Sequence, residues 1–203
     1  MPRLWLPERP LLLASTSATR RELLEGAGLP VEAAPSGLDE RAWQRDHGAA
    51  DPALIAAGLA RAKAEALARH HPDRVVLGAD QVLDLDGRTL HKPAGRAEAA
   101  GQLARLSGRA HLLHSAFALA VGGRVVHEGA DRARLTVRSL DAEARALYLG
   151  LLSDDVLAGV GIYQIEGVGL HLFEAAEGAH STILGLPLLP LLAALRALNL
   201  LAF

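Results

Sequence analysis

A chain of 203 residues, half of them hydrophobic, is long enough to bury a core of its own. The net charge of −2 provides no broad basic surface, so neither nucleic acid nor a membrane is an expected partner. The absence of cysteine excludes disulfides, thiolate metal sites and a cysteine nucleophile, and it suits the reducing cytoplasm where we expect this protein.

Neither apolar end of the sequence has the pattern of a membrane segment. Prolines and charges interrupt the first ten residues, so we expect no secretory signal. The run 183–203 is strongly apolar, but Pro187, Pro190 and Arg196 break the uncharged span of about 20 residues that a bilayer crossing needs. We expect a buried or interface helix there, which leaves a homodimer open.

A strand, a loop and a helix are predicted near the start of the chain. The apolar run 11–14 fits a buried strand, and Ser15 and Ser17 can cap a helix that runs through Arg20 to about residue 26. A helix N-terminus presents backbone N–H groups, so these hydroxyls and the guanidinium form a candidate phosphate site. Helix capping alone would also explain the serines.

Lysine is scarce, because only Lys63 and Lys92 among the 21 basic residues are lysine. A position that keeps lysine in an arginine-rich chain points to a need for a compact ammonium. Lys63 lies on a helix predicted from Asp51-Pro52 through 53–71, in the apolar stripe of Ile55, Leu59 and Leu67. Two interpretations stay open: a lysine whose stem covers apolar surface, or an ammonium directed into a site for anions.

Asp80 directly follows a strand predicted at 75–78. Ligands of α/β sheets usually bind where strands end, so this carboxylate is a candidate catalytic or metal-binding group. The alternative is a turn or cap aspartate. Asp39 and Glu40 form a second acidic pair, in a predicted loop before the helix at 53–71.

Asp86-Gly87 is a hairpin signal. A two-residue loop would pair Gln81 with Lys92, whereas a three-residue loop with a bulge would pair Asp80 with Lys92. Either register brings Lys92 beside Asp80, so that one phosphate or metal ion could touch both side chains. An ordinary cross-strand salt bridge would use the same pairing.

The remaining predicted elements alternate irregularly between strand and helix. Strands are expected at 81–85, 88–92, 111–121, 124–127, 132–137 and 170–174, helices at 97–106, 141–149 and after Pro187, and an irregular stretch at 158–169. This order favours an α/β fold with a mixed central sheet flanked by helices. We expect one domain over residues 1–203, of one or two lobes.

A glycine-flanked segment carries Tyr163 and Glu166. Glycines at 159, 161, 167 and 169 predict bends around an aromatic ring and hydrogen-bonding side chains that could meet the edge of a base. The alternative is a bulged strand.

These motifs, in this order, resemble the Maf family of nucleoside triphosphate pyrophosphatases over nearly the whole chain. The segments that carry the resemblance are 12–17, 20–24, 39–40, 60–64, 78–82, 91–93, 106–111, 161–169 and 184–188. The resemblance implies a two-lobed α/β fold with a substrate cleft, and hydrolysis of a nucleoside triphosphate to the monophosphate and pyrophosphate.

The resemblance also assigns roles to residues. Glu40 and Asp80 would hold a divalent cation, Mg²⁺ or Mn²⁺, and Asp80 would orient or deprotonate the water that attacks the α-phosphorus. Positive side chains would neutralise the charge on the phosphates, which is the main task in phosphoryl transfer. The implied substrate-binding set is Ser15, Ser17, Arg20, Lys63, Gln81, Lys92, Tyr163 and Glu166.

The sequence departs from the family pattern in three places. Ala18 and Thr19 stand where the family usually has proline and a large residue, often arginine. Gln81 replaces a frequent threonine and Glu166 a frequent glutamine, and both resemble the branch acting on 7-methyl-GTP more than the dTTP/UTP branch. The tryptophan common in the former branch is missing near Thr19, so the base stays open.

Two other classes of function compete with the enzyme. A nucleotide-binding regulator of cell division and septum formation would bind tightly without turnover. A structural module would dimerise through its apolar C-terminal helix and use the polar clusters as caps and salt bridges. The acidic pair of Glu40 and Asp80 favours the enzyme, because a pure binder has little use for acids close to a triphosphate.

Overall fold

The computed structural model describes residues 3–47, 51–153, 156 and 159–203. Residue contacts divide the chain into two compact units. The first unit comprises Met1–Gln81, His114–Asp131 and Ala179–Phe203, and the second comprises Val82–Leu113 and Arg132–Gly178. The expected single domain with a substrate cleft stays a prediction.

Seven strands form one mixed sheet in the order β2-β1-β3-β5-β6-β7, with β4 paired to β3. β1 (Leu11–Ala14) is parallel to β2 (Val31–Ala34) and to β3 (Val76–Leu85). β4 (Arg88–Leu90) is antiparallel to β3, and β7 (Phe173–Glu177) is antiparallel to β6 (Arg124–Val137). With β5 (Ala110–Val121) between β3 and β6, the predicted α/β fold with a mixed sheet is confirmed.

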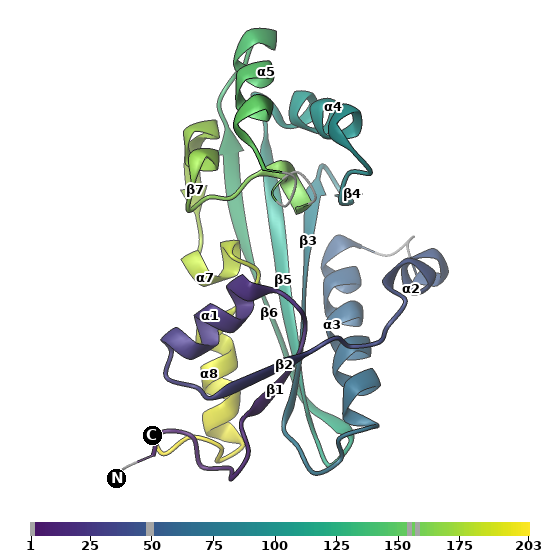
Figure 1. Cartoon of the computed structure of the whole chain (residues 1–203), viewed down its shortest axis with the longest axis vertical. Helices are drawn as coiled ribbons and strands as arrows, with labels where there is room; N and C mark the ends of the chain where they lie inside the picture. The colour runs from purple at the N-terminus through teal and green to yellow at the C-terminus, as the bar shows by residue number, and fades with distance from the viewer. Residues whose placement is uncertain (1–2, 48–50, 154–155, 157–158) are drawn as a thin grey trace. The chain divides into compact units, whose positions relative to one another are not determined.

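Helices cover both faces of the part of the sheet that belongs to the first unit (Figure 1). α1 (Ala18–Gly26) and α8 (Leu188–Ala197) lie on one side of β1, and α3 (Pro52–Ala68) lies on the other. Two shorter helices, α2 (Glu40–His47) and α7 (His180–Ile183), complete this unit. No described helix is long and apolar enough to span a membrane.

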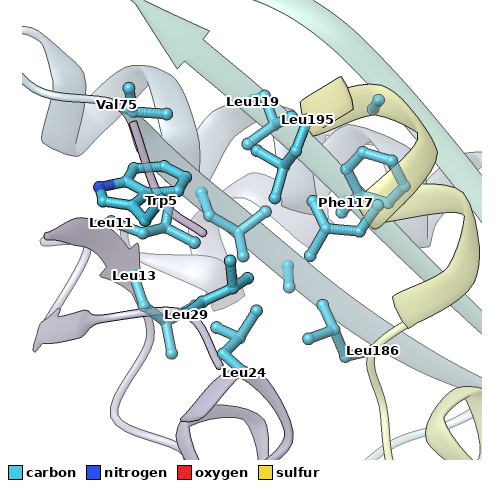
Figure 2. Close-up of a cluster of buried hydrophobic side chains, with 14 of the residues drawn as sticks. Trp5, Leu11, Leu13, Leu24, Leu29, Val75, Phe117, Leu119, Leu186 and Leu195 are labelled. Carbon is cyan, nitrogen blue, oxygen red and sulfur yellow. The ribbon is translucent and has the colours of Figure 1, made fainter. Parts of the chain in front are cut away.

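The four side chains of β1 alternate between two apolar cores, as the pleat of a strand dictates. One core, drawn in Figure 2, contains Leu11, Leu13, Leu24 of α1 and Leu195 of α8. The other contains Leu12, Ala14, and Ala64 and Leu67 of α3. Both faces of β1 are therefore buried, which explains why its sequence is apolar throughout.

The second unit contains two longer helices, α4 (Arg96–Leu106) and α5 (Ala142–Leu151). Two short 3-10 segments follow, η1 (Val160–Ile162) and η2 (Val168–Leu172). The Tyr148 hydroxyl of α5 donates a hydrogen bond of 3.0 Å to the carbonyl of Ile162, which ties η1 to this helix.

Two helices of the first unit, α1 and α3, begin directly after the capping residues that the sequence predicts. The Ser17 hydroxyl accepts from the backbone N–H of Arg20 at 3.3 Å, and α1 begins at Ala18. The Asp51 carboxylate accepts from the N–H of Ala53 at 2.8 Å, and α3 begins at Pro52. The helix ends at Ala68, three residues before the predicted end.

The Asp86-Gly87 turn has a two-residue loop, which was one of the two alternatives. Leu85 pairs with Arg88, and the two turn residues have φ values of 53° and 75°, as a type I′ turn requires. The ladder ends where Leu83 pairs with Leu90, so it does not reach Lys92. The predicted pairing of Lys92 with Gln81 or Asp80 is therefore wrong. Pro93, which follows Lys92, has no N–H that could extend the ladder.

Two predicted strands, 124–127 and 132–137, are one continuous strand, β6. Gly129 lies within it, and a Cβ there would come 2.5 Å from Cε1 of Phe117. This glycine leaves room for an aromatic ring of the core and does not interrupt the strand.

Other predicted boundaries also differ from the structure. The predicted strands 75–78 and 81–85 form one strand, β3, so Asp80 lies within a strand and does not follow the end of one. Glu40 is not in a loop but begins α2, because the Asp39 carboxylate caps it by accepting from Ala42 N–H at 2.9 Å. The predicted strand 170–174 begins only at Phe173, because Gly169 folds back against Gln164, where a Cβ would meet the carbonyl oxygen at 2.6 Å. Residue 158, the first of the predicted irregular stretch, lies outside the described residues.

Candidate functional site

Gly78 brings β3 and α3 of the first unit unusually close together. A Cβ at this position would lie 2.1 Å from the carbonyl oxygen of Ala60 and 2.5 Å from the backbone nitrogen of Ala64. Only glycine facing two alanines allows this approach. Asp80 is two residues further along β3 and therefore points to the same face, towards α3.

The close approach places Lys63 of α3 against Asp80. Its Nζ lies 2.5 Å from Oδ1 of Asp80 and 2.9 Å from Oε1 of Glu40. The side chains of Lys63 and Asp80 are 7% and 10% exposed, whereas that of Glu40 is 48% exposed. The buried Lys63 ammonium therefore contacts two carboxylates. It does not extend from the apolar stripe into water.

Burial governs the electrostatics of this cluster. Burial raises the pKa of Asp80 above its ordinary value, and the Lys63 and Arg20 charges oppose the shift without cancelling it. Burial also lowers the pKa of Arg20, while Asp80 and Glu40 raise it. Arginine starts so high that it stays charged at neutral pH. Asp80 is thus a stronger base than a solvated aspartate.

Arg20 is held at the junction of β1 and α1. Its Nε donates to the carbonyl of Gly185 at 2.9 Å, and its Nη1 donates to the Ser15 hydroxyl at 3.3 Å. The Ser15 hydroxyl also accepts from the N–H of Ser17 at 3.2 Å. The structure thus brings together the three residues predicted here as a phosphate site.

The side-chain amide of Gln81 has one orientation that satisfies its neighbours. Its Nε2 donates to the Ser115 hydroxyl at 3.0 Å and to the carbonyls of Thr182 and Ile183 at 2.9 and 3.0 Å. Oε1 points elsewhere, and a Cβ on Gly185 would lie 3.5 Å from it and 3.5 Å from Nη2 of Arg20. The Gln81 side-chain oxygen, which is a hydrogen-bond acceptor, and the Arg20 guanidinium therefore both lie next to Gly185, which has no side chain.

Sequence reasoning missed the groups that hold Gln81 and Arg20. The Ser115 hydroxyl donates to the carbonyl of Thr182 at 2.8 Å, and the Thr182 hydroxyl donates to Asp131 at 2.7 Å. Gly185 has φ of +96°, which favours glycine. The signal was the motif at 184–188, to which no role had been assigned.

The other predicted site residues belong to the second unit. Lys92 and Glu166 are exposed. The Tyr163 hydroxyl lies 2.6 Å from Nε2 of His111, and its ring packs edge-on against Phe173. His111 is 2% exposed, and burial lowers its pKa to about 4. The substrate-binding roles of Lys92, Tyr163 and Glu166 stay predictions.

Asp80 and Glu40 fit the ligand chemistry of a hard divalent cation. Carboxylate oxygens suit Mg²⁺ and Mn²⁺, and Mg²⁺ is commonly held by one or two carboxylates together with substrate phosphates and water. Within the described ranges, no group of three or more His, Asp or Glu side chains could hold a metal ion. A cation at these two acids would therefore depend on phosphate or water for its other ligands.

A hollow of about 790 Å³ also lies in the first unit, between α3 and the start of β6, but it contains none of the predicted site residues. Two of its arginines are paired with its own acids, Arg61 with Glu128 and Arg69 with Glu65. No described lysine lines this hollow, so it has no counterpart of the contact of Lys63 with Asp80 and Glu40.

The sequence profile described as "Maf-like protein" matches residues 10–198. This chain belongs to the Maf family. The resemblance drawn from its motifs is therefore confirmed, and the match covers almost all of both units.

Individual relatives span the same length as this Maf chain. A "Nucleoside triphosphate pyrophosphatase" of Rhodopseudomonas palustris (strain HaA2) is 50% identical, over 98% of this chain and 99% of that protein. A "7-methyl-GTP pyrophosphatase" of Rhizobium johnstonii is 46% identical, over 93% of this chain and 96% of that protein. A solved dITP/XTP pyrophosphatase of Mycobacterium abscessus is more distant, with 20% identity, a TM-score of 0.39, and coverage of 65% of this chain and 76% of that one.

Proposed function

We propose that this Maf protein hydrolyses a nucleoside triphosphate to the monophosphate and pyrophosphate. Relatives about 50% identical over nearly their whole length are named for this activity. The observation that carries the proposal is the contact of Lys63 with both Asp80 and Glu40, because two acids and a buried ammonium serve charge neutralisation and proton transfer together.

In the proposed reaction, a water molecule attacks the α-phosphorus. As the oxygen of this water bonds to the phosphorus, Asp80 accepts a proton from the water. The bond between the α-phosphorus and the bridging oxygen breaks, and pyrophosphate leaves with that oxygen. The raised pKa of Asp80 favours proton acceptance near neutral pH. Lys63 and Arg20 offset the negative charge of the phosphates, and Ser15 and Ser17 supply hydroxyl contacts.

A divalent cation is part of the proposal. Asp80 and Glu40 would hold it, and when bound, Mg²⁺ or Mn²⁺ supplies positive charge that polarises the phosphate oxygens. Lys63 would then share these two acids with the cation, so its ammonium would be available to a phosphate oxygen.

A product assay tests the proposal directly. The purified protein is incubated with Mg²⁺ or Mn²⁺, added inorganic pyrophosphatase and a panel of triphosphates that includes 7-methyl-GTP, dTTP and UTP. We expect monophosphate and released phosphate with at least one of them. Asp80→Asn should lower kcat by at least about 100-fold, because a general base contributes about 10²- to 10⁴-fold. Tight binding without products would favour the division regulator instead.

The base preference is a separate part of the proposal. Gln81 and Glu166 support a 7-methylguanine base, because both match that branch of the family. Glu166→Gln would remove a negative acceptor and change the ranking of kcat/KM across the triphosphates. An unchanged ranking would remove Glu166 from base recognition.

We also propose the cytoplasm as the compartment of this protein, because the expected substrate is a nucleotide.

We further propose a homodimer that uses the apolar α8. Leu189 on this helix is 69% exposed and Phe203 beyond it is 84% exposed. Light scattering should give a mass of about twice the chain's 21.3 kDa. A single-chain mass at micromolar concentration would contradict the dimer.

A further inference from the structure

α2 is attached to α3 by one large aromatic side chain. None of the residues of α2 is buried, and the helix lies beside α3 within the first unit (Figure 1). The ring of Trp43 lies over Gly58 of α3, where a Cβ would come 2.5 Å from Cη2 and 2.6 Å from Cζ2 of the indole. The absence of a side chain at Gly58 therefore makes the notch that receives this ring.

The ring also contacts a side chain of its own helix. His47, one turn further along α2, stacks on Trp43 with ring centroids 4.2 Å apart and an interplanar angle of 10°. Its Nδ1 lies 2.9 Å from the carbonyl oxygen of Trp43. The indole thus contacts both α3, at Gly58, and an imidazole of its own helix.

The same helix begins with a member of the candidate site. Glu40 precedes Trp43 by three residues, so both side chains lie on one face of α2, the face towards α3. Oε1 of Glu40 is 2.9 Å from Nζ of Lys63, although the Glu40 side chain is 48% exposed. A half-exposed carboxylate at the end of a short surface helix holds this position only if the helix itself is anchored.

We infer that Trp43 is a positioning residue, which docks in the Gly58 notch and so holds Glu40 against Lys63. The inference rests on the proposed function for its catalytic meaning. Trp43 touches neither Lys63 nor Asp80 through any described contact. It acts on the site through the position of α2.

A double-mutant comparison separates positioning from general support of the fold. Trp43→Ala and Glu40→Ala should each lower kcat/KM by about 10- to 100-fold, as loss of an outer residue that orients a ligand does. The double variant should be no worse than Glu40→Ala, because Trp43 acts only through that carboxylate. Trp43→Phe, which still fills part of the notch, should recover part of the loss. Losses that multiply in the double variant would overturn the inference.

Tryptophan emission provides a readout that needs no turnover. Gly58→Ala should push the indole off α3, so the emission of Trp43 should shift to the red relative to the wild type. In each protein, this emission is its spectrum minus the spectrum of the same protein with Trp43→Phe added. The kcat/KM of Gly58→Ala should fall as it does in Trp43→Ala. The matched control is Gly101→Ala in α4, because a Cβ there has nothing within 4 Å, and it should change neither quantity.

The two proposals fail in different ways. If the wild-type protein hydrolyses no triphosphate, the proposed function fails, whatever the emission of Gly58→Ala. If the wild type is active but Gly58→Ala keeps both the emission and the kcat/KM of the wild type, the positioning role of Trp43 fails alone.

Discussion

Asp80 combines burial with three charged neighbours, and this combination determines its chemistry. Burial raises its pKa, and Lys63 and Arg20 limit the rise. A carboxyl group with a raised pKa binds its proton more tightly in the folded state than in the unfolded state. Asp80 therefore contributes stability below about pH 3.9, the unfolded value, and this contribution is lost as the pH rises through its folded pKa.

The raised pKa of Asp80 predicts the acid limb of activity. The kcat/KM should fall on acidification with an apparent pKa above about 4, because the free enzyme loses its base when Asp80 is protonated. The measurement is a pH profile of kcat/KM for the wild type and for Glu40→Gln. The limb should persist in Glu40→Gln, and a limb at or below about pH 4 in the wild type would contradict this assignment.

Asp80 also predicts how stability responds to pH. The free energy of unfolding of the wild type, minus that of Asp80→Asn, should decrease as the pH rises from about 3 to 7, following the sign derived above. Urea denaturation of both proteins at several pH values measures this difference. A difference that increases with pH would mean that the pKa of Asp80 is lowered in the folded state.

Substitutions of the two lysines should change the free energy of unfolding by very different amounts. Lys63→Met leaves the buried Asp80 without its ammonium and should cost about 3 kcal/mol, whereas the exposed Lys92→Met should change stability by less than about 0.5 kcal/mol. Urea denaturation measures both. The same Lys92→Met protein tests the predicted role in substrate binding, because that role requires kcat/KM to fall while the fold is intact.

At the scale of elements, the contact between β3 and α3 positions the acid and the ammonium. Gly78 removes the side chain that would separate the two backbones, and the residues of α3 that it faces, Ala60 and Ala64, are small. The reach of Lys63 to Asp80 thus depends on three small residues that do no chemistry themselves. The elements decide how close the chemical groups come.

Gly78→Ala should therefore be among the most damaging single changes in the first unit. Its Cβ would meet backbone atoms of α3, which cannot swing away as a side-chain end can, so we expect a loss of about 3 kcal/mol or more and little activity. Gly150→Ala in α5, where a Cβ meets nothing within 4 Å, is the control and should be neutral or slightly stabilising. Differential scanning calorimetry compares the two variants, and equal melting temperatures would contradict the close approach.

At the scale of the whole molecule, His111 links stability to acid. It is buried, and among the described residues its Nδ1 has no hydrogen-bond partner. Its folded pKa of about 4 lies below the unfolded value of about 6.5, so it is neutral in the folded protein at neutral pH. The unfolded chain binds the proton first on acidification, so stability falls as the pH drops from about 6.5 to about 4.

Substitution of His111 should flatten this part of the stability profile. The pKa difference corresponds to about 3 kcal/mol between the two ends of the window. In His111→Gln, the free energy of unfolding should change less between pH 7 and pH 4, although the variant is less stable at pH 7 because its packing changes. Parallel curves for wild type and variant would contradict a neutral buried imidazole.

The sequence by itself determined features that depend on neighbouring residues. Ser17 and Asp51 start helices because a cap bonds to N–H groups two or three residues away, and Asp86-Gly87 makes its turn because both residues accept positive φ. The four-residue spacing of Ile55, Leu59 and Lys63 placed an ammonium on a buried face, where the structure finds it. The family was likewise visible in the order of short motifs.

Only the tertiary structure decided what these side chains meet. Lys63 and Asp80 are 17 residues apart, Gln81 and Thr182 are 101 apart, and Arg20 and Gly185 are 165 apart. Such contacts depend on how helices pack on the sheet, which local spacing does not encode. For the same reason the sequence could not show that Glu40 begins a helix docked through Trp43, because the notch at Gly58 exists only once α2 and α3 pack together.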